Sequence, residues 1–587
     1  MKTLKLFLTV LGAIVAILVF PHAAKTAFTL QKAWSGSPDG KQATHQTLAG
    51  PAATENARSA DQTSVNGSPN PESHPLPQTG SASPNEAQEK RAMVFGARGT
   101  VTIDHIPPGR FREQLLALPE APRRAALARL EAERVPLFDV RSLHVDAEGM
   151  LFYACPAAPD STQAVTAEML APSQAPVPIS SPPARSSKPD STKIIYLDFN
   201  GHTVTGTAWN SSNPSYQCLP YDLDGDPTTF SDYEQSQIIE VWERVAEDFK
   251  AFDINVTTSE PASFGSTVAR ALITKNTDAT GANNPSSTAG GVAYKNVFGT
   301  PSFHTSYSPA FAYFNKVGNT APNIAEVVSH EVGHNLGLSH DGTTSTEYYS
   351  GHGSGENSWG AIMGAAYGRN FTQWSKGDYY RANNTEDDLA IISAKTGFAA
   401  DDAAATLGNA NSLVVSDGGF LGDGFFIGAN ADVDLHRIVI DQASVTINAE
   451  SFKVPASASF GSNLGIQLEL LSSAGNLVAA AASQGQSTAT ISTSVAPGTY
   501  YIRVAGTSNG SPLASTPTGF TSYGSMGSYK IYGSVGSGGG NFSPVVATGD
   551  ATSATLNATT LGATVNPRGL STGVFFQYGT SETFGQN

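Results

Sequence analysis

Between residues 191 and 398, segments whose hydrophobic pattern is typical of β-strands are mixed with segments whose pattern is typical of α-helices. Strand-like apolar runs occur at 193–199, 254–257, 270–274, 291–294 and 311–314. Ser231 and Glu234 have the spacing of a helical capping box, and the residues after them place apolar side chains on one helical face. A second helical pattern covers 324–338. Strands mixed with helices in this way predict an α/β domain built on one sheet.

The flanking segments have other patterns. Residues 91–155 combine a strand-like alternation at 99–106, helical spacing at 122–134 and strand-like pieces at 137–145 and 150–153. They predict a small folded unit ahead of the α/β domain, in the position of a propeptide. Residues 402–535 show short strand patterns separated by Gly, Ser and Asn, typical of a β-sandwich. Residues 541–587 resemble the first strands of a further, incomplete β module, similar to fibronectin type III-like repeats. The predicted fold class is α/β followed by all-β modules.

Two segments lack the apolar residues that a core requires. Residues 25–90 and 156–190 are rich in Ser, Pro and Ala, so we expect a disordered leader and a linker. Residues 1–24 begin with Lys2 and Lys5 and continue with an apolar run too short for a comfortable membrane span, which needs about 20 residues. We interpret them as a signal peptide, with a retained N-terminal anchor as the alternative.

The composition indicates where the protein acts and which partners it does not bind. Charged residues make up 14% of the chain, below the roughly 25% of ordinary soluble domains, and there are 57 Gly and 35 Pro. This mixture is typical of β-rich extracellular modules. The net charge of −16 argues against nucleic acid or an anionic membrane as a partner. We therefore expect a secreted, soluble monomer, or one held at the cell surface.

One motif carries chemistry. The run from His330 to His340 reads HEVGHNLGLSH. Because residues four apart share a helical face, His330 and His334 can bind one metal ion. Gly337 can end the helix in a left-handed turn, so that the chain folds back and brings His340 to the metal. Three imidazoles and an open position are typical of catalytic Zn²⁺.

The third ligand has a competitor. A Glu on a later helix replaces the third His in some zinc sites, and Glu347 and Glu356 are the candidates here. Both lie in a Ser/Gly/Thr-rich stretch that does not support a helix, which favours His340. Glu331, adjacent to the first ligand, is the predicted general base that takes a proton from zinc-bound water and passes it to the leaving amine.

This motif, with Asp341 after His340, resembles the metzincin zinc endopeptidases, most closely their reprolysin (adamalysin) branch. The resemblance covers about residues 193–398 and implies a supporting methionine turn beneath the metal, for which Met363 is the candidate. In astacins and serralysins a tyrosine follows the methionine by two residues and can bind the zinc. Here Ala365 occupies that position and Tyr367 comes later, so we do not expect a tyrosine zinc ligand. The family also implies that an extended substrate pairs with an edge strand, for which we predict 291–294.

Cys155, at the end of the predicted propeptide, allows three interpretations. Its surroundings faintly resemble the matrixin cysteine switch, in which a propeptide thiolate occupies the zinc. A disulfide with Cys218 fits an oxidising compartment equally well, and unpaired thiols are the third case.

The remaining motifs suggest weaker sites. Asp222, Asp224 and Asp226 resemble the start of a calcium loop, but Pro227 and Tyr233 replace required EF-hand residues, which favours a solvated acidic loop over a Ca²⁺ site. In the predicted sandwich, 432–434, 496–504 and 523–529 resemble the bacterial pre-peptidase C-terminal domain, which implies a non-catalytic module that in some members binds Ca²⁺.

Together these features predict a secreted zinc metalloendopeptidase, made as a zymogen, that acts on proteins or peptides. Two alternatives remain open: a surface adhesin that keeps the fold without the activity, and a protease that processes only itself. The intact Glu331 argues against the adhesin, which needs no general base.

Overall fold

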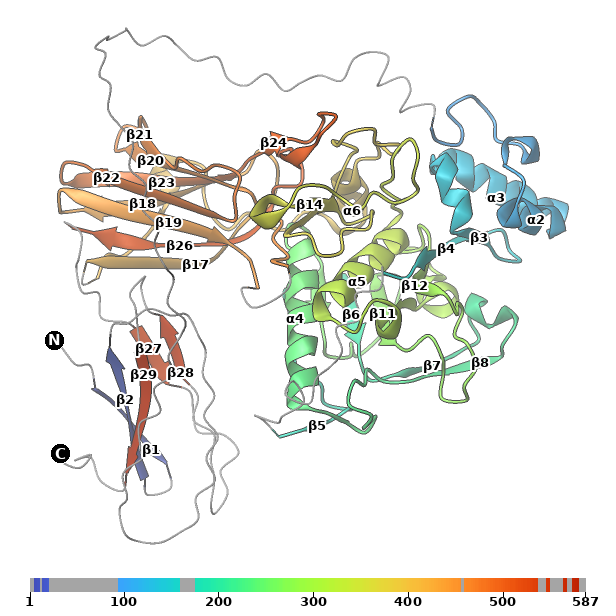
Figure 1. Cartoon of the computed structure of the whole chain (residues 1–587), viewed down its shortest axis with the longest axis horizontal. Helices are drawn as coiled ribbons and strands as arrows, with labels where there is room; N and C mark the ends of the chain where they lie inside the picture. Colours follow the sequence, from blue (N-terminus) through green and yellow to red (C-terminus); the bar gives the residue numbers. More distant parts are fainter. Residues whose placement is uncertain are drawn as a thin grey trace, which may run out of the picture.

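The computed structural model describes residues 5–10, 13–20, 93–158, 175–416, 418–454, 459–536, 545–548, 563–566 and 573–579. Three folded parts lie in a row (Figure 1): an N-terminal unit (93–156), a central domain (175–398) and a β-sandwich (402–536). The predicted leader at 25–90 lies outside the described residues. No helix in the described ranges is long and apolar enough to cross a membrane.

The N-terminal unit packs helices α2 (Arg110–Ala117) and α3 (Glu120–Ala132) against strands β3 (Leu143–Val145) and β4 (Leu151–Pro156). Its core is apolar and includes Phe111, Leu115 and Leu130. The predicted helix at 122–134 is confirmed, but the predicted strand at 99–106 is wrong. That segment contains the 3₁₀ turn η1 (Ile103–His105), where Thr102 and His105 satisfy each other's polar groups. In the strand-like piece predicted at 137–145, a second 3₁₀ turn, η2 (Leu137–Arg141), takes the first part, and only the end is a strand, β3.

One sheet runs through the central domain and into the N-terminal unit. Its order is β10-β6-β11-β13-β12-β4-β3. The central strands are β6 (Ile194–Asp198), β10 (Asn255–Thr257), β11 (Val268–Thr274), β12 (Ala289–Tyr294) and β13 (Ala310–Tyr313). The first four in the order are parallel, and β12 is antiparallel to both neighbours. Within the central domain β12 is therefore an edge strand, and β4 covers that edge.

Three helices accompany this sheet: α4 (Asp232–Asp248), α5 (Ala321–Leu336) and α6 (Asp388–Thr396). The predicted capping box is present, since the Ser231 side chain accepts from the Glu234 N–H. The face of α4 that carries Ile238, Val241 and Val245 is fully buried. These features confirm the mixed α/β architecture expected from the sequence.

The predicted linker is partly folded. Its last part contains β5 (Val177–Pro178), which pairs with β9 (Thr229–Phe230). The Arg185 N–H donates to Thr258 Oγ1 over 2.8 Å. Residues from 175 onward thus belong to the central domain, and 159–174 lie outside the described residues.

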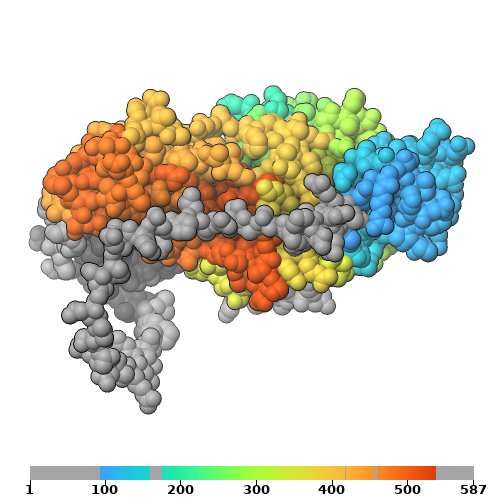
Figure 2. All heavy atoms as spheres, turned by 90° about the horizontal axis from the view of Figure 1, so that it is seen from above, coloured from blue at the N-terminus to red at the C-terminus, as the bar shows by residue number. Residues whose placement is uncertain are grey.

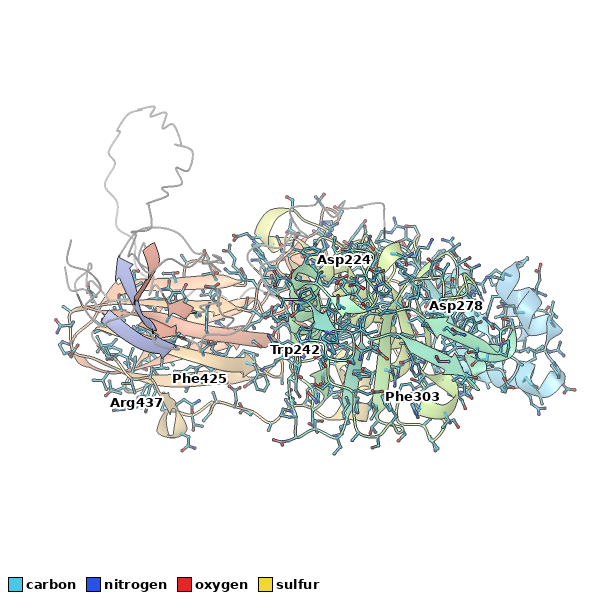
Figure 3. The ribbon with its side chains drawn as sticks, turned by 90° about the horizontal axis from the view of Figure 1, so that it is seen from below. Asp224, Trp242, Asp278, Phe303, Phe425 and Arg437 are labelled. Atoms are coloured by element: carbon cyan, nitrogen blue, oxygen red, sulfur yellow. The ribbon has the colours of Figure 1, made fainter. Side chains whose placement is uncertain are left out.

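The β-sandwich consists of two antiparallel-rich sheets around an apolar core. One has β16 (Asn411–Ser412), β18 (Val433–Ile440), β23 (Gly498–Gly506), β20 (Ile466–Ser472) and β21 (Leu477–Ala480). The other has β17 (Gly419–Ile427), β26 (Gly527–Val535), β19 (Ser444–Ser451) and β22 (Thr488–Ser494). Figure 3 shows it, with Phe425 and Arg437, beside the central domain with Trp242 and Phe303. The predicted all-β module is confirmed here.

Short elements complete the described chain. The strands are β7 (His202–Thr205), β8 (Ser215–Cys218), β14 (Trp359–Ala361), β15 (Phe371–Gln373), β24 (Asn509–Ser511) and β25 (Thr518–Phe520). The single turns are η3 (Ala208–Ser211), η4 (Phe303–Tyr307), η5 (Phe314–Lys316), η6 (Gly355–Asn357) and η7 (Leu407–Asn409). The backbones of β1 (Lys5–Val10), β2 (Ala13–Phe20) and β29 (Gly573–Gly579) pair, as do those of β27 (Val545–Thr548) and β28 (Ala563–Asn566).

Candidate metal centre

Helix α5 carries two of the predicted ligands through the middle of the molecule. It ends at Gly337, whose φ of +118° lies in the left-handed region that glycine adopts without strain. The Gly337 N–H donates to the carbonyls of Gly333 and His334, and the Leu338 N–H also donates to Gly333. The helix therefore stops as the sequence predicts, and the chain turns back toward its own last turn.

This reversal brings three imidazoles together. His330 and His334 lie one turn apart on α5, and His340 comes from the returning chain. His340 Nε2 lies 3.1 Å from His334 Nε2, and the His330 and His340 rings are 5.2 Å apart. The ligand atoms of the three histidines and Cys155 all lie within 4.8 Å of one another.

Hydrogen bonds orient the first two rings. His330 Nδ1 lies 2.9 Å from the Ile362 carbonyl and His334 Nδ1 lies 2.9 Å from the Leu338 carbonyl. A carbonyl only accepts, so each Nδ1 carries the proton and each Nε2 keeps a free lone pair. His330 Nε2 is buried without a hydrogen-bond partner among the protein atoms, which fits the role of a metal ligand.

The third ring has acidic neighbours instead. His340 Nδ1 lies 3.5 Å from Asp139 Oδ2 and 3.5 Å from Glu347 Oε1. Glu347 thus lies behind the ring, where it also accepts from the Ser142 hydroxyl. Glu356 lies in the exposed turn η6. The structure brings His340, and neither competing glutamate, into the group of convergent Nε2 atoms.

Burial keeps the three imidazoles neutral. It lowers the pKa of His330 to about 4. Burial first, and the neighbouring imidazoles second, hold the pKa values of His334 and His340 well below the usual range. Neutral imidazole is the form that binds a metal ion, so all three rings are in the ligating form at neutral pH.

Glu331 lies on α5 against strand β12. It is 1% exposed, and burial raises its pKa well above the usual value, while an interaction with the Cys155 thiol opposes that rise. A Cβ atom at Gly291 would lie 2.3 Å from Glu331 Oε1. Only glycine at this position of β12 leaves space for the carboxyl group.

Met363 lies directly beneath the ligand helix. It is fully buried, and a Cβ atom at Gly333 would lie 2.6 Å from its Sδ. The Met363 carbonyl accepts from the Asp341 N–H over 2.8 Å. Met363 therefore contacts the helix between its two histidines and the segment that carries the third.

Cys155 reaches the same point from β4. Its Sγ lies 3.4 Å from Nε2 of both His334 and His340. Cys155 pairs with Gly291 in the β4–β12 register. Burial, and then the charge of Glu331, raises the pKa of the Cys155 thiol well above its usual value. Cys218 is also a free thiol and contacts Asn284, so the structure contradicts a Cys155–Cys218 disulfide.

Sequence reasoning missed three residues around the imidazoles. The Tyr153 ring stacks on His334 at 4.1 Å, and its hydroxyl donates to Asp139 over 2.6 Å. Asp139 also accepts from the His340 N–H. The Tyr348 ring lies 4.2 Å from that of His340. No motif marks these residues, and for Tyr153 the only available signal was its place two residues before Cys155, on the same face of a strand.

Two acidic groups lie elsewhere. Asp222 and Asp224 come close to Glu234, but their oxygens accept from backbone N–H groups and Asp222 also pairs with Lys275. In the sandwich, Asp401, Asp432 and Asp434 approach one another. Asp434 accepts from the Tyr529 hydroxyl, so two of the sandwich motifs meet. The Ca²⁺ sites suggested by sequence stay predictions.

Comparisons with known proteins bear on two parts of the chain. Residues 207–375 match the family model Reprolysin_5, Metallo-peptidase family M12. No curated protein matches the chain. Among solved structures, a pre-peptidase C-terminal domain of collagenase from Bacillus anthracis is similar to part of the chain, with 15% sequence identity and a TM-score of 0.13. The match covers 21% of this chain and 92% of that structure. The metalloprotease assignment made from the motif, a hydrolase of peptide bonds with a reprolysin-like domain, is confirmed by the family match.

Proposed function

We propose that this protein is a secreted zinc endopeptidase in which His330, His334 and His340 hold the metal ion and Glu331 is the general base. The observation that carries the proposal is the convergence of three neutral imidazoles on one buried point. Zinc fits this donor set, because three imidazole nitrogens that leave one position open are typical of catalytic zinc. When bound there, zinc would polarise the scissile carbonyl and acidify a water molecule.

Glu331 would move the proton. Its carboxyl group lies against the edge strand β12, where an extended peptide would pair, and it interacts with the Cys155 thiol of the N-terminal unit. In its ionised form the Glu331 carboxylate can accept a proton from the attacking water and donate it to the leaving amine nitrogen. Gly291 would let the substrate backbone and Glu331 approach the same point.

We further propose that the N-terminal unit is an inhibitory propeptide. Strand β4 covers the edge of β12 in antiparallel register, and Cys155 is directed at the imidazoles. A thiol sulfur at that point would be a further metal ligand and would exclude water and substrate. Lys295 Nζ of the central domain lies 3.3 Å from Glu133 Oε2 of the N-terminal unit, and both side chains are largely buried. This ion pair would help to hold the unit against the central domain.

Casein cleavage by the mature protein tests the proposal. We expect turnover by the wild type, loss of turnover with a zinc chelator, and recovery when zinc is returned. Glu331→Gln keeps the size of the side chain and should abolish turnover while it retains zinc. Equal casein cleavage by all of these samples would refute the assignment.

Recovery of the processed protein outside the cell, with residues 1–24 removed, tests secretion. Mature protein that cleaves its own precursor but not casein would instead favour the self-processing alternative.

A further inference from the structure

The β-sandwich is joined to the central domain by a largely buried interface. Arg244 donates to the Ser459 carbonyl over 2.6 Å, and the Ser528 N–H donates to Glu247 over 2.8 Å. Tyr523 and Met526 of the sandwich belong to the same apolar cluster as the residues of α4 and α5. Red-orange residues of the sandwich lie beside yellow residues of the central domain in Figure 2. The two parts therefore share one core.

A first chain of hydrogen bonds leads from this interface to the ligand helix. Asn463 of the sandwich donates from Nδ2 to Asp248 Oδ1 on α4 over 3.1 Å. Asp248 Oδ2 accepts from the Ser329 hydroxyl over 2.6 Å, and Ser329 directly precedes His330. All three side chains are at most 6% exposed. Water therefore cannot replace either bond at low cost.

A second chain leads to the imidazole itself. The backbone carbonyl of Asn463, which an Asn463→Ala change leaves in place, accepts from Gln373 Nε2 over 2.5 Å. The Gln373 carbonyl accepts from the Ile362 N–H over 3.0 Å, and the Ile362 carbonyl is the partner of His330 Nδ1. The Asn463 side chain thus leads to Ser329, the residue before His330, and its backbone carbonyl leads to the carbonyl that orients the His330 ring.

The fit at this point is close. A Cβ atom at Gly524 of the sandwich would lie 2.7 Å from Gln373 Cβ and 2.7 Å from the Trp374 carbonyl oxygen. The Trp374 indole N–H donates to the Asp248 carbonyl over 2.7 Å. The residues around Gln373 and Asp248 are therefore closely packed, so the hydrogen-bonded side chains of both chains have little space to move.

We infer that the β-sandwich is a structural part of the metal centre and that Asn463 is a positioning residue for His330. The inference rests on the proposed function, because it concerns how firmly His330 holds zinc. Partners that orient a ligand typically change metal affinity about 10- to 100-fold when they are lost.

The release of zinc to a chelator, followed in the full-length chain, tests this role. Asn463→Ala should speed release about 10-fold, in the range of other orienting partners. The matched control is His352→Ala, which removes a buried hydrogen bond to the Gly519 carbonyl of the sandwich. His352 also bonds the Tyr349 hydroxyl over 2.7 Å. Neither bond belongs to the two chains that lead to His330, so this variant should release zinc at the wild-type rate.

A double-mutant cycle gives the second measurement. Ser329→Ala removes the other end of the first chain and should speed release to a similar extent. The double variant with Asn463→Ala should release zinc no faster than either single variant, since both changes break the same chain. Ser329→Ala also keeps the test decisive if Asn463→Ala does not fold.

The outcomes separate the two proposals. Wild-type protein without zinc would overturn the proposed function and this inference together. Wild-type protein with zinc, but with equal release rates in Asn463→Ala and His352→Ala or with additive effects in the cycle, would overturn the inference alone.

Discussion

The sulfur of Met363 packs so closely against Gly333 that a methyl group on that glycine would lie 2.6 Å from Sδ. Gly333 lies between His330 and His334, so the contact is made at the centre of the ligand helix. We expect Gly333→Ala to lower the free energy of unfolding by about 1–3 kcal/mol, the usual cost of overpacking a filled core. Denaturant unfolding of the full chain measures it.

A compensating change tests the contact directly. The double variant Gly333→Ala with Met363→Ala should be more stable than the sum of its single effects predicts, because the shortened side chain removes the clash. Additive effects on the free energy of unfolding would show that Met363 is not the side chain that excludes a methyl group at position 333.

Gly291 is expected to control activity rather than stability. In Gly291→Ala the new methyl group would displace the Glu331 carboxyl group. We expect the mature enzyme to lose roughly 100-fold in kcat/KM, as for other misplaced catalytic groups, while zinc content stays unchanged. Gly290→Ala is the matched control: its methyl group would meet the Pro156 carbonyl of β4 and Val317 Cγ1, but not Glu331, so it should loosen the N-terminal unit and leave mature activity intact. The same loss of mature activity in both variants would contradict this role for Gly291.

Cys155 is expected to maintain latency. Cys155→Ser replaces a strong zinc ligand with a weak one, so the unprocessed chain should cleave a peptide substrate that the wild-type precursor does not. Cys218→Ser changes the other buried thiol, which lies beside Asn284, and should leave the precursor latent. A Cys155→Ser precursor as inactive as the wild type would show that β4 blocks the site without its sulfur.

The stability of the sandwich should depend on pH through His436. This fully buried side chain donates to the Tyr529 hydroxyl and packs on Phe425, and burial lowers its pKa to about 4. The unfolded state binds the proton more readily, so the stabilisation is complete above pH 6.5 and is lost as the pH falls toward 4. The loss reaches about 3 kcal/mol at most.

The variant His436→Gln keeps a neutral donor for Tyr529 and should flatten this part of the pH profile. Thermal unfolding between pH 4 and 8, with the wild type measured alongside, provides the measurement. Parallel profiles for the two proteins would exclude His436 as the source.

Local patterns determined much of this molecule. The spacing of His330, His334 and Gly337 predicts the ligand helix and its end, because helical geometry and the left-handed turn act within a few residues. The capping box at Ser231 and the strand at 291–294 also follow from short-range rules. The strand expected at 99–106 failed because Thr102 and His105 form a local turn that the alternation did not reveal.

Other relationships arise only in the folded chain. Asp139, Tyr153 and Glu347 meet around His340 although up to about 200 residues separate them, and no local pattern predicts such contacts. Sequence left Cys155 between a disulfide and a metal site, and the pairing of β4 with β12 placed it at the imidazoles. The link from Asn463 to His330 likewise depends on how two domains pack, since a buried polar group takes whichever partner the tertiary structure brings within reach.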